Sequence, residues 1–365
     1  LTGAHPARTG IIANTWYEPD GKRGTKPIYC AEDERDPASS PKNPVVSAFH
    51  LKVPTLGEYM KQANPASRNV AVSAKDRAVM MMGGHQIDAA YWWKGAGFVT
   101  LNGRTLSPAA NRENAAITAT LKKGAKGLPI PANCTASNLA VPVGKGSAGT
   151  GTFVLPTDKP DAFRISPRMD AATVDLANAL VDEMQLGKGA APDILSVSLS
   201  ATDYIGHATG TEGLEMCIQM AQLDANIGRL LAHLDKAGID YVVVLSADHG
   251  GLDMPERLDR QAYPRAARVD TSLSAEVLAK AVAAKTGLVV LDSPLIFGEG
   301  GDYYVSRALK PADRARAIDA LLALVRGNRQ VAAAYSTDEL AKTPLPSGNP
   351  QDWSLKERAR ASWDP

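Results

Sequence analysis

A long amphipathic helix pattern between two apolar runs constrains the fold more than any other feature of this sequence. Residues 213–237 place Met216, Leu223, Leu230 and other apolar residues at three- and four-residue steps, which predicts one apolar helix face. The flanking runs "DILSVSLS" (193–200) and "YVVVLSA" (241–247) have the length and β-branched composition of buried strands. This strand–helix–strand order predicts an α/β fold with a mostly parallel central sheet that helices cover on both faces.

Further elements fit the same fold class. The segment "VPTLGEYMKQA" (53–63) has helical spacing with Thr55 as its N-cap, and "NVAVS" (69–73) is typical of a strand. Helical periodicity also predicts helices at about 170–186, 271–286 and 311–326. Residues 124–160 are rich in Gly, Pro, Ser and Thr, which favours a loop-rich insertion over core structure.

Charge and cysteine content exclude some functions and leave others open. The 365 residues carry 40 basic and 39 acidic side chains, so no charge excess indicates binding to nucleic acid or to an anionic membrane. No apolar stretch reaches the roughly 20 residues that a membrane-spanning helix needs. Cys30, Cys134 and Cys217 are widely separated and form no metal-binding motif. They allow at most one intrachain disulfide, and they do not decide the redox compartment.

Two polar clusters follow the two predicted strands. Asp203 and His207 come after the first strand, and Asp248 and His249 come directly after the second. Either pair alone could belong to an ordinary loop or turn. A right-handed crossover, however, would bring both strand ends together at the edge where open parallel sheets bind ligands. Carboxylate and imidazole groups are typical zinc ligands in hydrolytic sites, and paired metal ions catalyse phosphoryl transfer. The two clusters together therefore predict a metal site.

The segments "SATDYIGHATG" and "LSADHGG" that hold these clusters resemble the metal-binding motifs of the alkaline phosphatase superfamily. The closer resemblance is to PafA-like and Sphingomonas-type alkaline phosphatases, to which the nucleotide pyrophosphatase/phosphodiesterases are related. It implies an alkaline-phosphatase-like α/β/α sandwich that binds two Zn²⁺ ions. One ion would be held by Asp203 and His207 and the other by Asp248 and His249. A further Ca²⁺ site is left open.

Two more segments carry the resemblance. "LTGAHPARTGIIANTWY" (1–17) is similar to the segment that follows the family's threonine nucleophile, which implies that Asn14 hydrogen-bonds a phosphoryl oxygen. "VAVSAKDRAVMMMGGH" (70–85) is similar to the loop in which monoesterases carry a Lys-x-Arg pair. Without the resemblance, Asn14 would be a loop residue, and Lys75 and Arg77 would lie in a solvated turn. With it, the two cations would stabilise the extra negative charge of a phosphate monoester.

The resemblance implies hydrolysis of small-molecule phosphate monoesters through a phosphothreonine intermediate, in a periplasmic or secreted protein. It describes a single catalytic domain over residues 1–365, with a loop-rich insertion at about 90–165. The nucleophilic threonine and an early strand are expected before Leu1, and a last histidine ligand after Pro365. We therefore expect an internal fragment that lacks the N-terminal strand and the C-terminal segment. Such a fragment would bind zinc weakly and turn over little or nothing.

Other readings compete with this one. A phosphodiesterase or nucleotide pyrophosphatase would use the same site, and a non-catalytic metal-binding relative would share the fold. A sulfatase would need a Cys or Ser in a C/S-x-P-x-R context, which none of the three cysteines has, and the alternative stays open only for a motif in the N-terminal part expected before Leu1. Gly144, Gly146 and Gly149 match G-x-G-x-x-G, but Pro142 precedes them and an extended segment follows, which favours a flexible loop over a dinucleotide site. The oligomeric state is left open.

Overall fold

The computed structural model describes residues 1–21, 23–263 and 265–363. These residues divide into two units. The first contains residues 1–11 and 30–267, and the second contains residues 12–29 and the chain from Arg268 onward. No helix in the described ranges is long and apolar enough to cross a membrane. The expectation of one catalytic domain over the whole chain stays a prediction.

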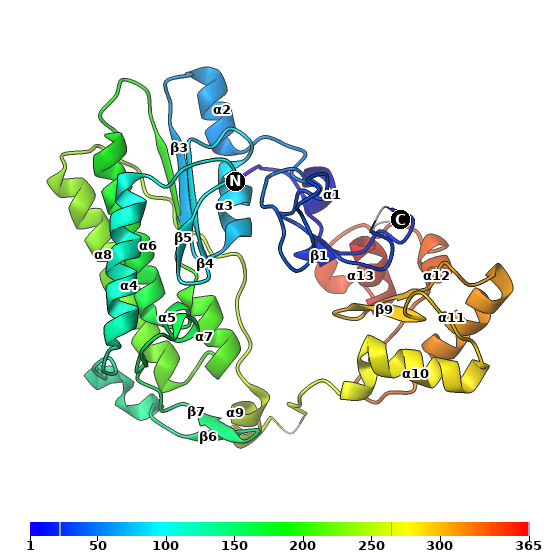
Figure 1. Ribbon diagram of the computed structural model, residues 1–365. Helices are drawn as coiled ribbons and strands as arrows, with labels where there is room; N and C mark the ends of the chain where they lie inside the picture. The colour runs from blue at the N-terminus through cyan, green and yellow to red at the C-terminus, as the bar shows by residue number, and fades with distance from the viewer. Residues whose placement is uncertain (22, 264, 364–365) are drawn as a thin grey trace. The chain divides into compact units, whose positions relative to one another are not determined.

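A four-stranded sheet in the order β5-β4-β3-β8 forms the centre of the first unit (Figure 1). Its strands are β3 (Asn69–Ser73), β4 (Ala89–Lys94), β5 (Gly97–Val99) and β8 (Ile194–Ser198). The central strand β3 pairs in parallel with both β4 and β8, and β5 is antiparallel to β4. Ser73 is in register with Ser198, so β3 and β8 end side by side. The predicted α/β class with a mostly parallel sheet is confirmed.

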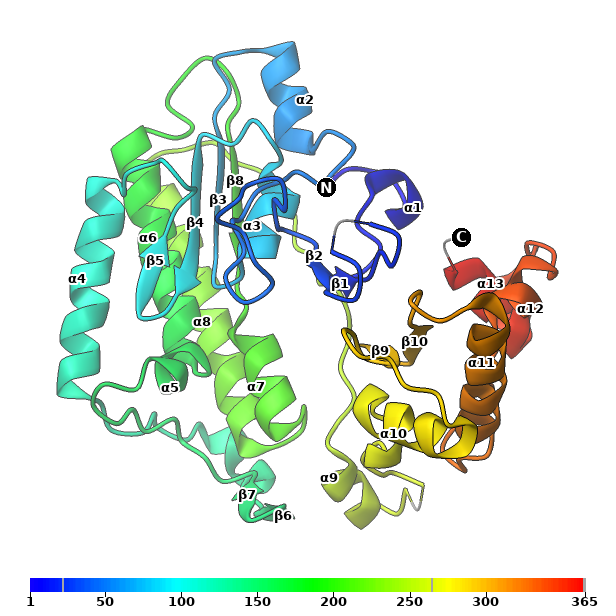
Figure 2. The same cartoon turned by 45° about the vertical axis from the view of Figure 1, so that its right-hand side comes forward.

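Helices cover both faces of this sheet, as Figure 2 shows. The helices α4 (Pro108–Lys123) and α6 (Pro167–Met184) pack on one face, with α8 (Leu214–Lys236) packed against α6, and α3 (Asp76–Gly83) lies on the other. The apolar stripes of α4 and α6 enclose Val70, Val72, Tyr91 and Trp93 of the sheet. Burial of these large apolar side chains is the main stabilising contribution to the unit. The helices predicted at 170–186 and 213–237 are confirmed.

Local hydrogen bonding explains where the short helix α2 begins. The helix α2 (Leu56–Ala63) starts at Thr55, whose hydroxyl accepts the Glu58 N–H while the Glu58 carboxylate accepts the Thr55 N–H. This capping box satisfies two backbone donors that the first helical turn would otherwise leave unpaired. The remaining helices of the first unit are α1 (Pro6–Thr9), α5 (Pro160–Arg164), α7 (Ala201–Thr209) and α9 (Pro255–Arg260).

The predicted strand at 241–247 is wrong. These residues form neither helix nor strand, and Val242 and Val244 are 91% and 88% exposed. A strand exists only through hydrogen bonds to a partner, and β8 pairs with β3 alone among the described strands. The apolar, β-branched composition of this run signals strand propensity but supplies no partner. The expected second strand of the crossover is therefore not formed.

The predicted loop-rich segment contains a 3-10 helix, η1 (Ala132–Ser137), and a hairpin of β6 (Val141–Val143) and β7 (Gly146–Ala148). A disulfide joins Cys134 in η1 to Cys217 in α8, and Cys30 is a buried free thiol. The run that contains Gly144 and Gly146 forms the turn of this hairpin and its second strand, β7, rather than a dinucleotide-binding loop. The wider expected insertion at about 90–165 also includes most of β4, all of β5 and α4, which belong to the central layers.

The second unit has its own apolar core. The helices α10 (Ala275–Thr286) and α11 (Pro311–Arg326) pack with the hairpin of β9 (Ile296–Glu299) and β10 (Asp302–Val305). Both helices agree with the predicted periodicity. The strands β1 (Thr15–Trp16) and β2 (Ile28–Tyr29) form a small antiparallel pair, and Tyr17 contacts the rings of Phe297 and Tyr304. The unit also contains η2 (Thr271–Leu273), α12 (Thr337–Ala341), η3 (Pro350–Asp352) and α13 (Leu355–Ser362).

Candidate active site

The candidate site lies at the carboxyl ends of the adjacent strands β3 and β8. Lys75 follows β3 as the N-cap residue of α3, and Arg77 lies in the first turn of that helix. Asp203 lies in the first turn of α7, which begins shortly after β8. The hydroxyls of Ser73 and Ser200 are 3.1 Å apart and join the two chain segments at this edge. The parallel register thus brings together residues that are 128 positions apart in the sequence.

Asp203 lies close to two of the other predicted metal ligands, His207 and His249. Its Oδ2 accepts a hydrogen bond from Lys75 Nζ at 2.5 Å. Its Oδ1 lies 3.5 Å from Nε2 of His207, one helical turn further along α7, and 3.6 Å from Nε2 of His249. Asp248 approaches the same His249 nitrogen at 3.5 Å. The structure therefore places both predicted clusters together, although the strand expected to carry the second cluster is absent.

The charges around Asp203 favour its ionised form. Burial alone would raise the pKa of this carboxyl, but the Lys75 hydrogen bond and charge, together with His207 and His249, lower the pKa below its ordinary value. The carboxylate is therefore negatively charged throughout the neutral range. An ionised carboxylate beside two imidazoles has the donor chemistry that zinc prefers.

A complete metal centre is not assembled, however. Within the part of the chain that the structure describes, no three His, Cys, Asp or Glu side chains are placed to hold one metal ion. Lys75 takes one oxygen of Asp203, and the side chains of His207 and Asp248 are about four-fifths exposed. The types of donor fit zinc, whereas their arrangement does not form a closed ligand set. The metal roles of the four residues stay predictions.

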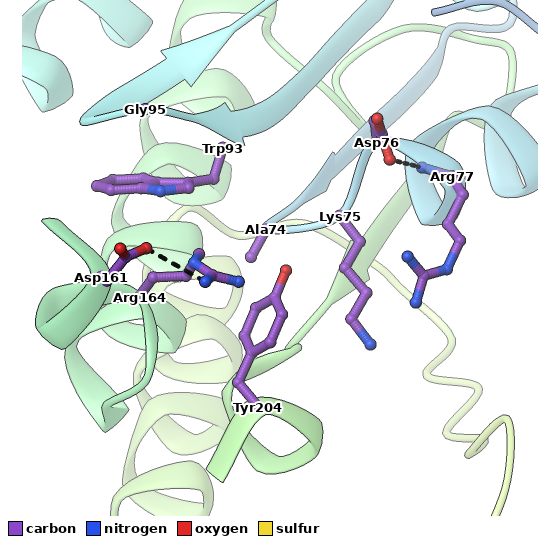
Figure 3. Close-up of a pocket in the computed structure, with 9 residues that line it drawn as sticks. All are labelled: Ala74, Lys75, Asp76, Arg77, Trp93, Gly95, Asp161, Arg164 and Tyr204. Carbon is purple, nitrogen blue, oxygen red and sulfur yellow. Dashed lines mark hydrogen bonds and ion pairs between the residues drawn. The ribbon is translucent and has the colours of Figure 1, made fainter. Parts of the chain in front are cut away.

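A pocket of about 300 Å³ opens beside Lys75 and Arg77 (Figure 3). Sequence reasoning missed three side chains that line it, Trp93 of β4, Arg164 of α5 and Tyr204 of α7. Tyr204 directly follows Asp203 in the sequence, and that adjacency was the one available signal. Arg164 lay within the expected insertion and carried no motif, so only the folded chain places it here.

Asn14 belongs to the second unit, where it is exposed and immediately precedes β1. Lys75, Arg77 and the four predicted metal ligands all belong to the first unit. The proposed contact of Asn14 with a phosphoryl oxygen stays a prediction.

Fold and site define an α/β protein of a known hydrolase family. Residues 1–362 match the family model described as type I phosphodiesterase / nucleotide pyrophosphatase, and the chain belongs to this family. The resemblance to the alkaline phosphatase superfamily is thereby confirmed.

The chain is also similar to individual proteins that are named alkaline phosphatases. Over its whole length the chain is 46% identical to alkaline phosphatase PhoK of Sphingomonas sp. and 42% identical to alkaline phosphatase PhoD of Zymomonas mobilis. It spans 66% and 64% of these two relatives, respectively. The crystal structure of wild-type alkaline phosphatase PafA is also similar, with a TM-score of 0.79 at 25% sequence identity. The match covers all of this chain and 71% of the PafA chain.

Proposed function

We propose that this chain carries the phosphate-binding part of a zinc-dependent alkaline phosphatase that hydrolyses small-molecule phosphate monoesters. The observation that carries the proposal is the placement of Lys75 and Arg77 at the end of β3, beside an open pocket and the ionised Asp203. The names of the relatives PhoK and PhoD support the same activity.

Substrate charge explains the choice of monoesters. A phosphate monoester carries two negative charges outside the bond that breaks, and a diester carries one. The Arg77 guanidinium offers a planar fork for two oxygens, and the Lys75 ammonium adds a point charge. Together with Asn14, these groups would bind the non-bridging oxygens and orient the phosphoryl group for attack. Such positioning and charge stabilisation make up most of what a protein contributes to phosphoryl transfer.

The proposed metal ligands are Asp203 with His207 for one Zn²⁺ and Asp248 with His249 for the other. When bound, the ions would supply Lewis-acid stabilisation of the attacking and leaving oxygens. Within the chain itself, Lys75 holds Asp203 in place. The proposed reaction passes through a phosphothreonine, as the family resemblance implies.

An oxidising compartment, periplasmic or extracellular, belongs to the same proposal. The disulfide between Cys134 and Cys217 supports it, because such bonds persist mainly outside the reducing cytosol.

The test compares p-nitrophenyl phosphate with its bis-ester on the intact protein. In the Lys75→Ala/Arg77→Ala double variant, kcat/KM for the monoester should fall about 100-fold or more, while the diester loses about tenfold or less. The control is Arg112→Ala on the exposed side of α4, which should leave both rates unchanged. Unchanged monoester turnover in the double variant would sink the monoesterase proposal.

The same assay separates the competing functions. Faster hydrolysis of the bis-ester by the unaltered protein would indicate a phosphodiesterase, which the family model also allows. Absence of turnover on both esters in zinc-loaded intact protein would indicate a non-catalytic metal-binding relative.

A further inference from the structure

The pocket beside the proposed phosphate-binding pair contains a third cation, Arg164. Figure 3 shows Tyr204 between Arg164 on one side and Lys75 on the other. The Arg164 Cζ lies 4.6 Å from the centroid of the Tyr204 ring, and Lys75 Nζ lies 5.2 Å from it. A single aromatic ring thus separates two positive groups that face the same cavity.

Arg164 is held in this position by the packing of its own short helix. Phe163, the preceding residue, is buried, and its ring stacks on Trp93 of β4 at 5.4 Å with an interplanar angle of 6°. Because α5 is anchored to the sheet through this stack, the last residue of the helix projects into the pocket. A cation that is already positioned loses little side-chain entropy when it binds an anion.

The charge of Arg164 is only weakly offset. Its guanidinium pairs with Asp161 at 3.2 Å, but the Asp161 side chain is 85% exposed whereas that of Arg164 is 30% exposed. An ion pair with so exposed a carboxylate contributes little, because water screens it. An incoming anion could therefore displace Asp161 at small cost. The guanidinium fork is also suited to two-oxygen recognition of a carboxylate or a phosphate.

We propose that Arg164, supported by Tyr204, binds a second anionic group on the organic part of the substrate. The proposal rests on the proposed function, because Lys75 and Arg77 would hold the phosphoryl group at one end of the same pocket. The cavity volume of about 300 Å³ is at the lower end of small-molecule sites. The preferred substrates are thus compact phosphate monoesters that also carry a carboxylate or a second phosphate.

The test is a binding measurement that needs no turnover. Isothermal titration calorimetry on the whole chain would compare phenylphosphonate with 4-phosphonobenzoate, two non-hydrolysable probes that differ by one carboxylate. The unaltered chain should bind 4-phosphonobenzoate about tenfold more tightly, which corresponds to about 1.4 kcal/mol. In Arg164→Gln this ratio should fall to about one, and in Arg164→Lys, which keeps the charge but loses the fork, to an intermediate value near threefold.

A matched control is Arg112→Gln, an exposed arginine of α4 outside the pocket, which should keep the tenfold ratio. Equal affinities for the two probes in the unaltered chain would overturn the second-anion subsite and leave the proposed function standing. A ratio that persists in both Arg164 variants would do the same. If neither phosphonate binds the unaltered chain, both the subsite and the phosphate-binding role of Lys75 and Arg77 are lost.

Discussion

Two aspartates near the candidate site show how strongly the surroundings of a residue set its charge. Asp203 is partly exposed and faces Lys75, so its pKa is lowered. Asp170 on α6 is fully buried, and burial raises its pKa to about 6, although it accepts the Ala201 N–H and a hydrogen bond from Gln219. The first carboxylate pairs with the Lys75 ammonium at the surface of the site. The second fixes the start of α7 from inside the core.

We predict that Asp170→Asn alters how stability depends on pH. The folded-state pKa of Asp170 lies above its ordinary value, so the folded protein binds the proton more readily than the unfolded chain does. Its contribution to stability is therefore greatest below pH 4 and decreases as pH rises through about 6, by roughly 2 to 3 kcal/mol. Asparagine cannot ionise, so the variant should lack this decrease. Urea midpoints at pH 4, 5.5 and 7 would measure it.

The informative quantity in that experiment is the difference between variant and unaltered protein at each pH, because other carboxylates add their own pH dependence. Asp224→Asn on the exposed side of α8 is the control and should follow the unaltered curve. Parallel curves for Asp170→Asn and the unaltered protein would contradict a raised pKa at Asp170.

At the scale of elements, helices were predicted more securely than strands. The helices α6, α8 and α11 can be predicted from their own residues, because the buried face of a helix appears in the sequence as apolar residues at three- and four-residue steps. A strand needs a partner elsewhere in the chain, so "NVAVS" and "YVVVLSA" look alike in sequence although only the first is paired. The site divides in the same way. Asp203 and His207 share one helix and were predicted together, whereas Arg164 depends on the stacking of Phe163 with Trp93.

The unpaired run at 241–247 should make the chain prone to self-association. Exposed β-branched residues outside any described strand pairing can pair with another copy of the chain. We predict that Val242→Lys combined with Val244→Lys reduces association, because both side chains are about nine-tenths exposed and lysine repels a like strand. Light scattering against concentration would measure the effect. The thermal midpoint should stay within about 2 °C, since surface changes are usually worth ±0.5 kcal/mol or less.

A matched control places the same two charges elsewhere. Ala115→Lys with Ala119→Lys on the exposed side of α4 changes the net charge equally. If that pair suppressed association as much as the valine replacements, net charge rather than strand pairing would be the cause.

Each of the two described units contains a large apolar core of its own. One lies between the sheet and its helices, and includes Leu176 and Leu180. The other joins α10, α11 and the β9–β10 hairpin around Val282 and Leu321. Since each unit buries its own apolar residues, each has its own source of stability. A single unfolding free energy then does not describe the chain.

We predict that core substitutions destabilise one unit at a time. Leu321→Ala should lower the stability of the second unit by about 2 to 4 kcal/mol through the cavity it leaves, with little effect on the first unit. Leu180→Ala should do the reverse. Hydrogen exchange followed by mass spectrometry would resolve the two units by peptide. Equal loss of protection in both units after either change would show that they unfold as one.

Asp203 and Tyr204 are consecutive residues in one turn of α7, which limits how the sequence of this turn can change during evolution. Asp203 pairs with Lys75, and the Tyr204 ring contacts both Lys75 and Arg164, so remodelling this turn would disturb the proposed phosphate-binding cation together with the proposed second-anion subsite. The short helix α5 supplies Arg164 and contributes none of the residues that pair with Asp203. If the proposed function holds, changes in substrate range should therefore accumulate in α5, while the sequence of the α7 turn stays fixed.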